Sequence, residues 1–357
     1  MERKIKIDVV RCIGNYLIVM LHAGAVFQYC ISSTIEYKFW TYFCWCVCPA
    51  ALPAMFLISG YLMFSRFSFT AYPKKISNRI RRLVVPYFVW NISFVIFYLI
   101  MEHFVPRLNA RVSSFGLDSL GGAFEKICSL TVAPIDGPLW FLRTLFFMAL
   151  CSPIFWLFLK SRRGRILGGV IIFFSYFLCY HFDLLPSMTL TYPLYAITTF
   201  YFGGVLAVTN EYYTRFKWFK SKMWLIPSFV GILLLGYTVY LNDSFQNTSS
   251  ALIDDLGKLL LTPVLFMFVN HLNLESVYSN KVFCYMKDMS FFMYAGHFLF
   301  CSMLMHTAAP FLGFMTTGKF TVLVFIFVGV GVPVMAGIYW IGKKHLPRVM
   351  KLYDGTL

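Results

Sequence analysis

The sequence predicts an all-α polytopic membrane protein with about ten transmembrane helices. Hydrophobic residues make up 59% of the chain and charged residues only 13%, whereas ordinary soluble domains carry roughly 25% charged residues. Ten apolar segments are each near the length that crosses a hydrocarbon core of about 30 Å. Basic residues are concentrated in alternate loops between these segments. We therefore expect one transmembrane domain over residues 1–357, with little chain left for a soluble domain.

The ten expected spans follow one another along the chain. They are 8–28, 41–64, 83–101, 138–159, 166–182, 190–209, 223–241, 256–271, 290–310 and 320–342. The first is expected to be a retained helix, because Asp8, Arg11, Asn15 and His22 interrupt the apolar stretch that a cleaved signal peptide needs.

The basic residues that give the chain its net charge of +16 lie mainly in alternate loops. This distribution argues against a nucleic-acid-binding surface. With these spans, 24 of the 31 lysine and arginine residues fall at the termini and in the loops on the same side of the membrane. Five fall on the opposite side, and Arg143 and Lys258 lie within or at the edge of spans. The positive-inside rule then predicts that both termini are cytoplasmic. The long loop 102–137 is expected outside, as a cover for an extracytoplasmic site.

Four polar residues share one face of the first expected helix: Asp8, Arg11, Asn15 and His22. Arg11 and His22 are eleven residues apart, which is close to three helical turns. Ionisable residues inside a membrane are costly and usually face a protein interior or a wet cavity. Asp8 and Arg11 alone would also suit an interface anchor, since both can snorkel, but His22 lies too deep. We predict a catalytic site of His22, Arg11 and Asp8.

The ten cysteines do not indicate a disulfide framework or a metal site. Cys44, Cys46 and Cys48 are two residues apart, so on a helix they point to different faces. We expect no bound metal. Cys30 and Cys128 fall on the outer side and remain candidates for a disulfide pair.

Five motifs, in this order, resemble those of the membrane-bound acyltransferase 3 family, which includes O-acetyltransferases of bacterial surface polysaccharides. They are Arg11 and His22 with ten residues between them, Phe56–Tyr61, Arg79–Tyr87, Leu139–Leu142 and Met293–His297. The phenylalanine pair typical of the second motif is Met55-Phe56 in this chain. The chain resembles the short, stand-alone members of the family.

The resemblance implies a multi-pass protein of the bacterial inner membrane with O-acyltransferase activity. The acetyl or other acyl group would come from cytoplasmic acyl-CoA, a co-substrate rather than a permanently bound cofactor. The acceptor would be a hydroxyl of an extracytoplasmic or lipid-linked glycan. A neutral imidazole suits this chemistry, because it can take the proton of the attacking hydroxyl; His22 is the expected general base. Nothing in the sequence indicates an oligomeric state.

The remaining candidate residues are assigned from their chemistry and their places on the expected spans. Donor binding is expected at Arg79, Arg81, Arg82, Tyr294 and His297, acceptor binding at Trp140 and Arg143, and the second-helix motif contributes Ser59, Gly60 and Tyr61. The three arginines equally fit ordinary positive-inside charge, and His297 equally fits a satisfied core histidine. Arg143 also fits an arginine that snorkels to the outer interface.

Two other functions compete with acyl transfer. The first is a membrane transporter of a polar solute or a lipid-linked glycan, which would favour inverted repeats and helices broken by glycine or proline. No convincing internal symmetry is present. The second is a glycosyltransferase that uses a lipid-linked sugar, but the first outer loop offers only Glu36 as an acidic residue for a metal.

Overall fold

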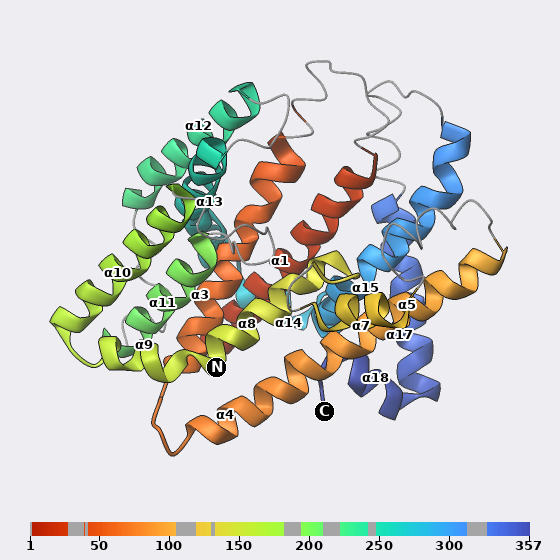
Figure 1. Cartoon of the computed structure of the whole chain (residues 1–357), viewed down its shortest axis with the longest axis horizontal. Helices are drawn as coiled ribbons and strands as arrows, with labels where there is room; N and C mark the ends of the chain where they lie inside the picture. Colours follow the sequence, from red (N-terminus) through yellow and green to blue (C-terminus); the bar gives the residue numbers. More distant parts are fainter. Residues whose placement is uncertain are drawn as a thin grey trace.

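The computed structural model describes residues 2–27, 39, 42–104, 119–129, 133–181, 194–209, 222–241, 248–312 and 327–357. All regular secondary structure in these residues is helical (Figure 1), so the prediction of an all-α chain is confirmed. The elements are α1 (Glu2–Phe27), η2 (Tyr42–Val47), η3 (Cys48–Ala50), α3 (Ala51–Phe64), α4 (Tyr72–Arg79), η4 (Ile80–Val84), α5 (Val85–Phe104), α7 (Leu120–Cys128), η6 (Gly137–Leu139), α8 (Trp140–Leu150), α9 (Ser152–Leu159), α10 (Arg162–His181), α11 (Leu194–Thr209), η9 (Lys222–Trp224), α12 (Leu225–Leu241), α13 (Thr248–His271), α14 (Leu274–Ser279), α15 (Lys281–Leu312), η10 (Phe327–Gly331), α17 (Val332–His345) and α18 (Pro347–Asp354).

Helices occupy the described part of each of the ten predicted segments, with one break at Cys151. Three helical runs are long and apolar enough to cross a membrane: Tyr42–Phe64, Tyr72–Ile100 and Lys222–Val239. The bent pair Gly137–Leu150 and Ser152–Leu159 makes a fourth if it counts as one span. Length and composition therefore support a membrane protein.

The helix of the expected span 138–159 is broken in two. Its two halves, α8 and α9, meet at Cys151 with a bend of 56°. Pro153 explains the break, because it has no backbone N–H and its ring clashes with the carbonyl four residues earlier. That carbonyl, of Ala149, accepts a hydrogen bond of 2.7 Å from the hydroxyl of Ser152 instead.

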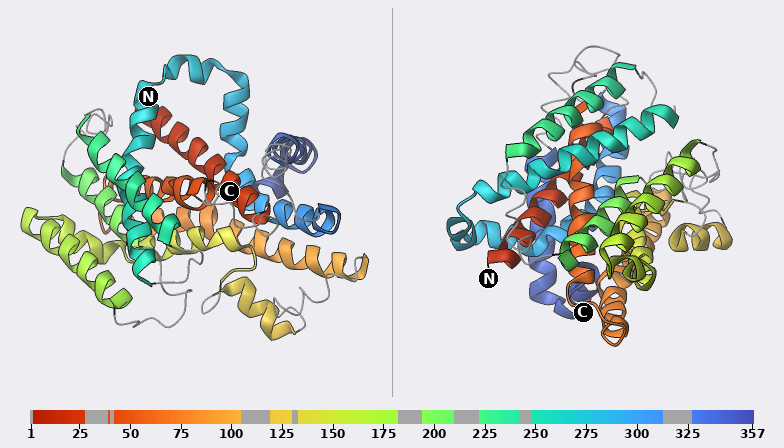
Figure 2. Two further views of the ribbon diagram at one scale, coloured as in Figure 1. Left: turned by 90° about the horizontal axis from the view of Figure 1, so that it is seen from above. Right: turned by 90° about the vertical axis from the view of Figure 1, so that its left-hand side faces the viewer.

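The centre of the bundle is α3, which is apolar around its whole circumference and almost entirely buried. Figure 2 shows α1 and α3 in the middle, with α10 to α13 on one side and α15 to α18 on the other. The helices α3 and α11 approach closely through glycines: a Cβ at Gly60 would lie 1.9 Å from the carbonyl oxygen of Phe200, and one at Gly203 would lie 2.1 Å from that of Leu57. The first helix, α1, contacts both α3 and α15.

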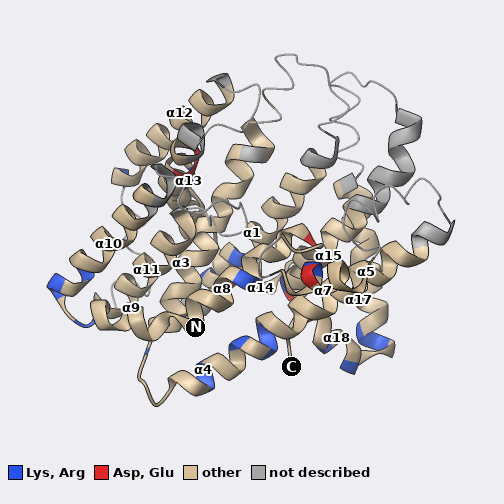
Figure 3. Ribbon diagram, viewed as in Figure 1, with Lys and Arg blue, Asp and Glu red and all other residues tan. Residues whose placement is uncertain are grey.

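The outer helices expose apolar side chains at helical spacing. Examples are Ile92, Ile96 and Leu99 on α5, Ile166, Val170 and Phe173 on α10, and Ile226, Phe229 and Leu233 on α12. Contiguous exposed apolar faces of this kind are rare on soluble monomers and suit contact with lipid. Basic residues on α4, at the start of α10 and on α18 lie on the side of the bundle where both chain ends lie (Figure 3).

The glycine contact between α3 and α11 generates a stability prediction. Gly60→Ala should lower the free energy of unfolding in detergent by about 1–3 kcal/mol, because the added methyl group overpacks a backbone contact that cannot yield. Gly236→Ala on α12 is the matched control, since a Cβ there has no described neighbour within 4 Å, and it should leave stability unchanged or slightly higher. Equal thermal unfolding midpoints for the two variants would contradict the close approach of α3 to α11.

Candidate active site

A pair of histidines lies where α1 packs against α15. Nδ1 of His22 is 3.1 Å from Nε2 of His297, and the ring centroids are 4.9 Å apart. His22 is partly exposed, whereas His297 is buried at 1% exposure. The sequence singled out both residues but gave no reason to pair them, because the contact depends on how the two helices pack.

Backbone carbonyls determine which nitrogens of the pair carry protons. A carbonyl oxygen only accepts, so the carbonyl of Tyr294, 2.5 Å away, takes the N–H at Nδ1 of His297. The carbonyl of Ile18, 2.9 Å away, likewise takes the N–H at Nδ1 of His22. Nε2 of a neutral His297 then accepts from the same N–H of His22. Nε2 of a neutral His22 is left as the unprotonated nitrogen, and no described residue hydrogen-bonds to it.

A cavity of about 560 Å³ lies beside the earlier turns of α1. Asp8, Arg11 and Asn15 of the predicted polar stripe all line it. Its charged lining consists of the basic residues Arg11, Arg79, Arg82 and Lys287 and the acidic residues Asp8, Asp288 and Asp354. Tyr294 also lines the cavity, and its carbonyl holds His297, so this residue connects the cavity to the histidine pair.

The basic segment that leads into α5 has an unusual backbone. Residues Ile80–Val84 form the π-helical turn η4, in which the N–H of Val85 reaches the carbonyl of Ile80. This wider turn precedes Pro86, which has no N–H to give to a regular α-helix. Arg79 and Arg82 line the cavity, whereas Arg81, which is exposed like Arg82, is not among the lining residues. The sequence grouped these three arginines, and the structure separates Arg81 from the other two.

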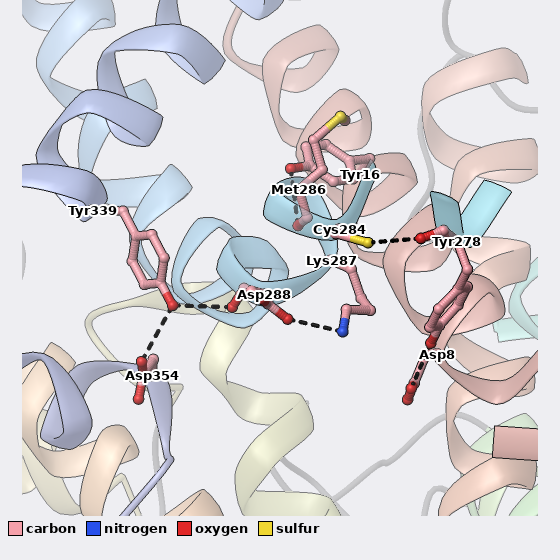
Figure 4. Close-up of polar contacts among 9 residues, drawn as sticks. All are labelled: Asp8, Tyr16, Tyr278, Cys284, Met286, Lys287, Asp288, Tyr339 and Asp354. Atoms are coloured by element: carbon pink, nitrogen blue, oxygen red, sulfur yellow. Dashed lines mark hydrogen bonds and ion pairs between the residues drawn. The ribbon is translucent and has the colours of Figure 1, made fainter. Parts of the chain in front are cut away.

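Tyr278 on α14 fixes one acidic group of the cavity. Its hydroxyl donates a hydrogen bond of 2.9 Å to Asp8 (Figure 4). Burial, together with this hydrogen bond, raises the pKa of Tyr278, so the phenol stays protonated and remains a donor. Asp8 also lies close enough to Arg11, one turn further along α1, to interact electrostatically.

Lys287 on α15 pairs with Asp288 at 2.9 Å, and its ammonium lies 5.6 Å from the centre of the Tyr278 ring. This hydrogen bond raises the pKa of Lys287, so its ammonium stays charged beside the cavity. Figure 4 shows both residues between the Tyr278–Asp8 contact and the Tyr339–Asp354 contact.

Trp140 and Arg143, the predicted acceptor residues, lie on α8 outside the described lining of this cavity. Arg143 is buried and donates to the carbonyl oxygen of Ser129, with a further hydrogen bond of 3.1 Å to the Ser129 hydroxyl. It therefore anchors the segment after α7 to α8. The ring of Trp140 packs 6.2 Å from that of Phe56, centroid to centroid.

The second-helix motif serves mainly packing. Ser59 lines the cavity, and its carbonyl accepts a hydrogen bond of 3.3 Å from Arg79. Gly60 permits the contact with α11, and Tyr61 is buried in a cluster with apolar residues of α1.

Sequence reasoning missed one fully buried acid, Asp136, just before η6. Its backbone N–H donates to the side-chain oxygen of Asn91 at 3.2 Å. Neither of its carboxyl oxygens has a hydrogen-bond partner among the described residues, which is costly for a buried polar group. It lies close enough to Tyr294 and Cys301 on α15 to interact with them electrostatically. An acid directly before a Gly-Pro turn was the available signal.

Cys44, Cys46 and Cys48 are buried with free thiols. Across the described ranges, no three histidine, cysteine, aspartate or glutamate side chains gather as metal ligands. The suggested pair of Cys30 and Cys128 lies outside the described residues, because Cys30 is not among them.

Comparison with known proteins agrees with the motifs. The sequence model of the acyltransferase 3 family, described as an acyltransferase domain, matches residues 4–341. The chain belongs to the acyltransferase 3 family. No curated protein and no solved structure matches the chain. The family match identifies a membrane acyltransferase, and it includes His22, His297 and every cavity residue named above except Asp354.

Proposed function

We propose that this acyltransferase is an integral inner-membrane O-acyltransferase. It moves an acetyl or other acyl group from cytoplasmic acyl-CoA to a hydroxyl of an extracytoplasmic or lipid-linked glycan. The observation that carries this proposal is a charged cavity, rich in arginine, that runs beside the helix bearing His22 and is linked to the histidine pair through Tyr294. Family membership supplies the reaction class.

The basic residues of the cavity suit the phosphates of the donor. Arginine binds phosphate through paired, charge-assisted hydrogen bonds. Arg79 and Arg82 approach from η4 and its flank, and Arg11 approaches from α1. Arg11 lines the cavity and is solvent-accessible, so its guanidinium can contact a ligand there. His22 lies about 16 Å further along the helix axis, at 1.5 Å per residue. An extended pantetheine arm spans this distance and brings the thioester to the imidazole.

In the proposed reaction the acceptor hydroxyl attacks the thioester carbon while Nε2 of His22 takes its proton. A C–O bond forms, the C–S bond breaks, and the proton passes from His22 to the departing CoA thiolate. The charged His22 keeps its hydrogen bond to the Ile18 carbonyl, and the lone pair of His297 lies on the same N–H. Asn15, between Arg11 and His22 on α1, lines the cavity on the path proposed for the pantetheine arm.

We further propose that the ten helical segments are ten membrane spans with both termini in the cytoplasm. The unequal distribution of basic residues supports this orientation. In this arrangement the donor enters from the side of the termini. The acceptor reaches His22 from the other face, near the Gly-Pro turn before α8.

The first prediction of this proposal concerns the base. His22→Ala should reduce acyl transfer by about 10²–10⁴-fold, the usual contribution of a general base, while the amount of inserted protein stays unchanged. Transfer of radiolabelled acetyl from acetyl-CoA to membrane glycan measures this. His271→Ala, at the exposed end of α13, is the matched control and should retain full activity. Near-normal transfer by the His22 variant would remove this mechanism.

The second prediction concerns topology. In a cysteine-free background, Leu120→Cys should react with a membrane-impermeant thiol reagent in intact spheroplasts. Lys351→Cys should react only after permeabilisation, because the positive-inside rule puts the C-terminus in the cytoplasm. Both positions are exposed. Labelling of both from the same side would contradict the ten-span arrangement.

A further inference from the structure

The residues at and after the end of the last helix, α18, line the cavity in which the donor is proposed to bind. Asp354, Gly355 and Thr356 line it together with Arg82 and Lys287. The family match ends at residue 341, so this wall is built by residues outside the matched region. Its contribution therefore cannot be deduced from the family motifs.

Asp354 holds this segment in place through contacts to its own neighbourhood. Its side chain is 1% exposed and forms an ion pair of 2.5 Å with Lys343 on α17. Its other carboxyl oxygen accepts the N–H and the hydroxyl of Thr356, at 3.0 Å and 2.6 Å. The Tyr339 hydroxyl lies 3.4 Å from Asp354 and 3.2 Å from the carbonyl of Asp288, and can donate to either. Asp354 is thus a positioning residue rather than a ligand.

Gly355 places the segment directly against the basic turn η4. It has a φ of 67°, and a Cβ on it would lie 2.9 Å from the carbonyl oxygen of Arg82. Glycine tolerates both the left-handed backbone and the close approach. Two residues earlier, the carbonyl of Tyr353 accepts a hydrogen bond of 3.0 Å from Trp90, and the Tyr353 hydroxyl lies 2.7 Å from that of Ser93. The segment is therefore packed on both α5 and η4.

We propose that Gly355 and Thr356, held by Asp354, form the subsite for the nucleotide end of the acyl-CoA donor, next to the phosphates on Arg82. This inference rests on the proposed function. If the thioester lies at His22, the nucleotide must lie at the other end of the pantetheine arm, which is the end of the cavity that carries Arg82 and the chain terminus. The Thr356 side chain is exposed there. Hydroxyl and backbone groups suit the polar edges of a ribose and a base.

The test compares two donors that share the thioester and the pantetheine arm and differ at the nucleotide end. Acetyl-CoA carries the nucleotide with its diphosphate, and acetyl-pantetheine has neither. Gly355→Val should raise the KM for acetyl-CoA by at least about tenfold, equivalent to roughly 1.4 kcal/mol of binding. Its kcat/KM for acetyl-pantetheine should stay within about twofold of the wild type, because the reacting end is unchanged. Thr356→Val should shift the KM for acetyl-CoA in the same direction by a smaller factor.

Gly337→Val is the matched control, because a Cβ at Gly337 on α17 meets no atom of the described residues within 4 Å; it should behave like the wild type with both donors. An unchanged KM for acetyl-CoA in Gly355→Val, or an equal loss with both donors, would overturn the subsite. If Gly355→Val does not accumulate, the same criteria apply to Thr356→Val. A wild-type protein that transfers acetyl from neither donor would instead refute the proposed function itself.

Discussion

The contact between two imidazoles, from Nδ1 of His22 to Nε2 of His297, is the interaction on which the rest of the site depends. It joins α1 to α15 inside the bundle, where a polar group without a partner is costly. Carbonyls of the same two helices orient both rings, three or four residues before each histidine. As a result, one nitrogen of His22 is left to act on a substrate. Displacing either helix along its axis would break this arrangement.

The cavity depends on the same packing of α1. Its polar stripe runs from Asp8 to His22, and the neighbouring helix α3 is apolar and fully packed. One wall of the cavity is formed by α3, through residues such as Ser59. The charged groups that face the polar stripe come from η4 and α15, where Arg82 and Lys287 line the cavity. The π-helical turn before Pro86 gives η4 the irregular backbone that presents two arginines to the cavity and one to the exterior.

Much of the fold could be predicted from the sequence, because apolar segment length and loop charge are local properties. The helical positions, the polar stripe of α1 and the motif residues on α15 follow from them. The break at Cys151 was also available in principle from Pro153, but a proline bends some helices and ends others. Neighbouring residues on a helix point to different faces, but which of Arg81 and Arg82 faces the cavity depends on how η4 packs against the other helices.

Contacts between distant segments were beyond sequence reasoning. The pairing of His22 with His297, the buried acid Asp136 and the wall formed by Asp354 all depend on tertiary packing. Trp140 and Arg143 show the converse case. Trp140 lies in a motif of the family and Arg143 directly follows that motif, yet Arg143 is engaged with Ser129 and neither lines the described cavity. The acceptor side of the site thus remains a proposal based on resemblance, whereas the donor side also has a cavity.

The most direct measurement is a structure of the protein in lipid with a thioether analogue of acetyl-CoA, which cannot transfer its acyl group. The account predicts the diphosphate of the analogue between Arg79, Arg82 and Arg11. It predicts the carbon that replaces the thioester carbonyl beside Nε2 of His22, at the far end of an extended pantetheine arm. An analogue bound with its reactive end remote from the histidine pair, or with its phosphates outside the arginine cavity, would contradict the central claim.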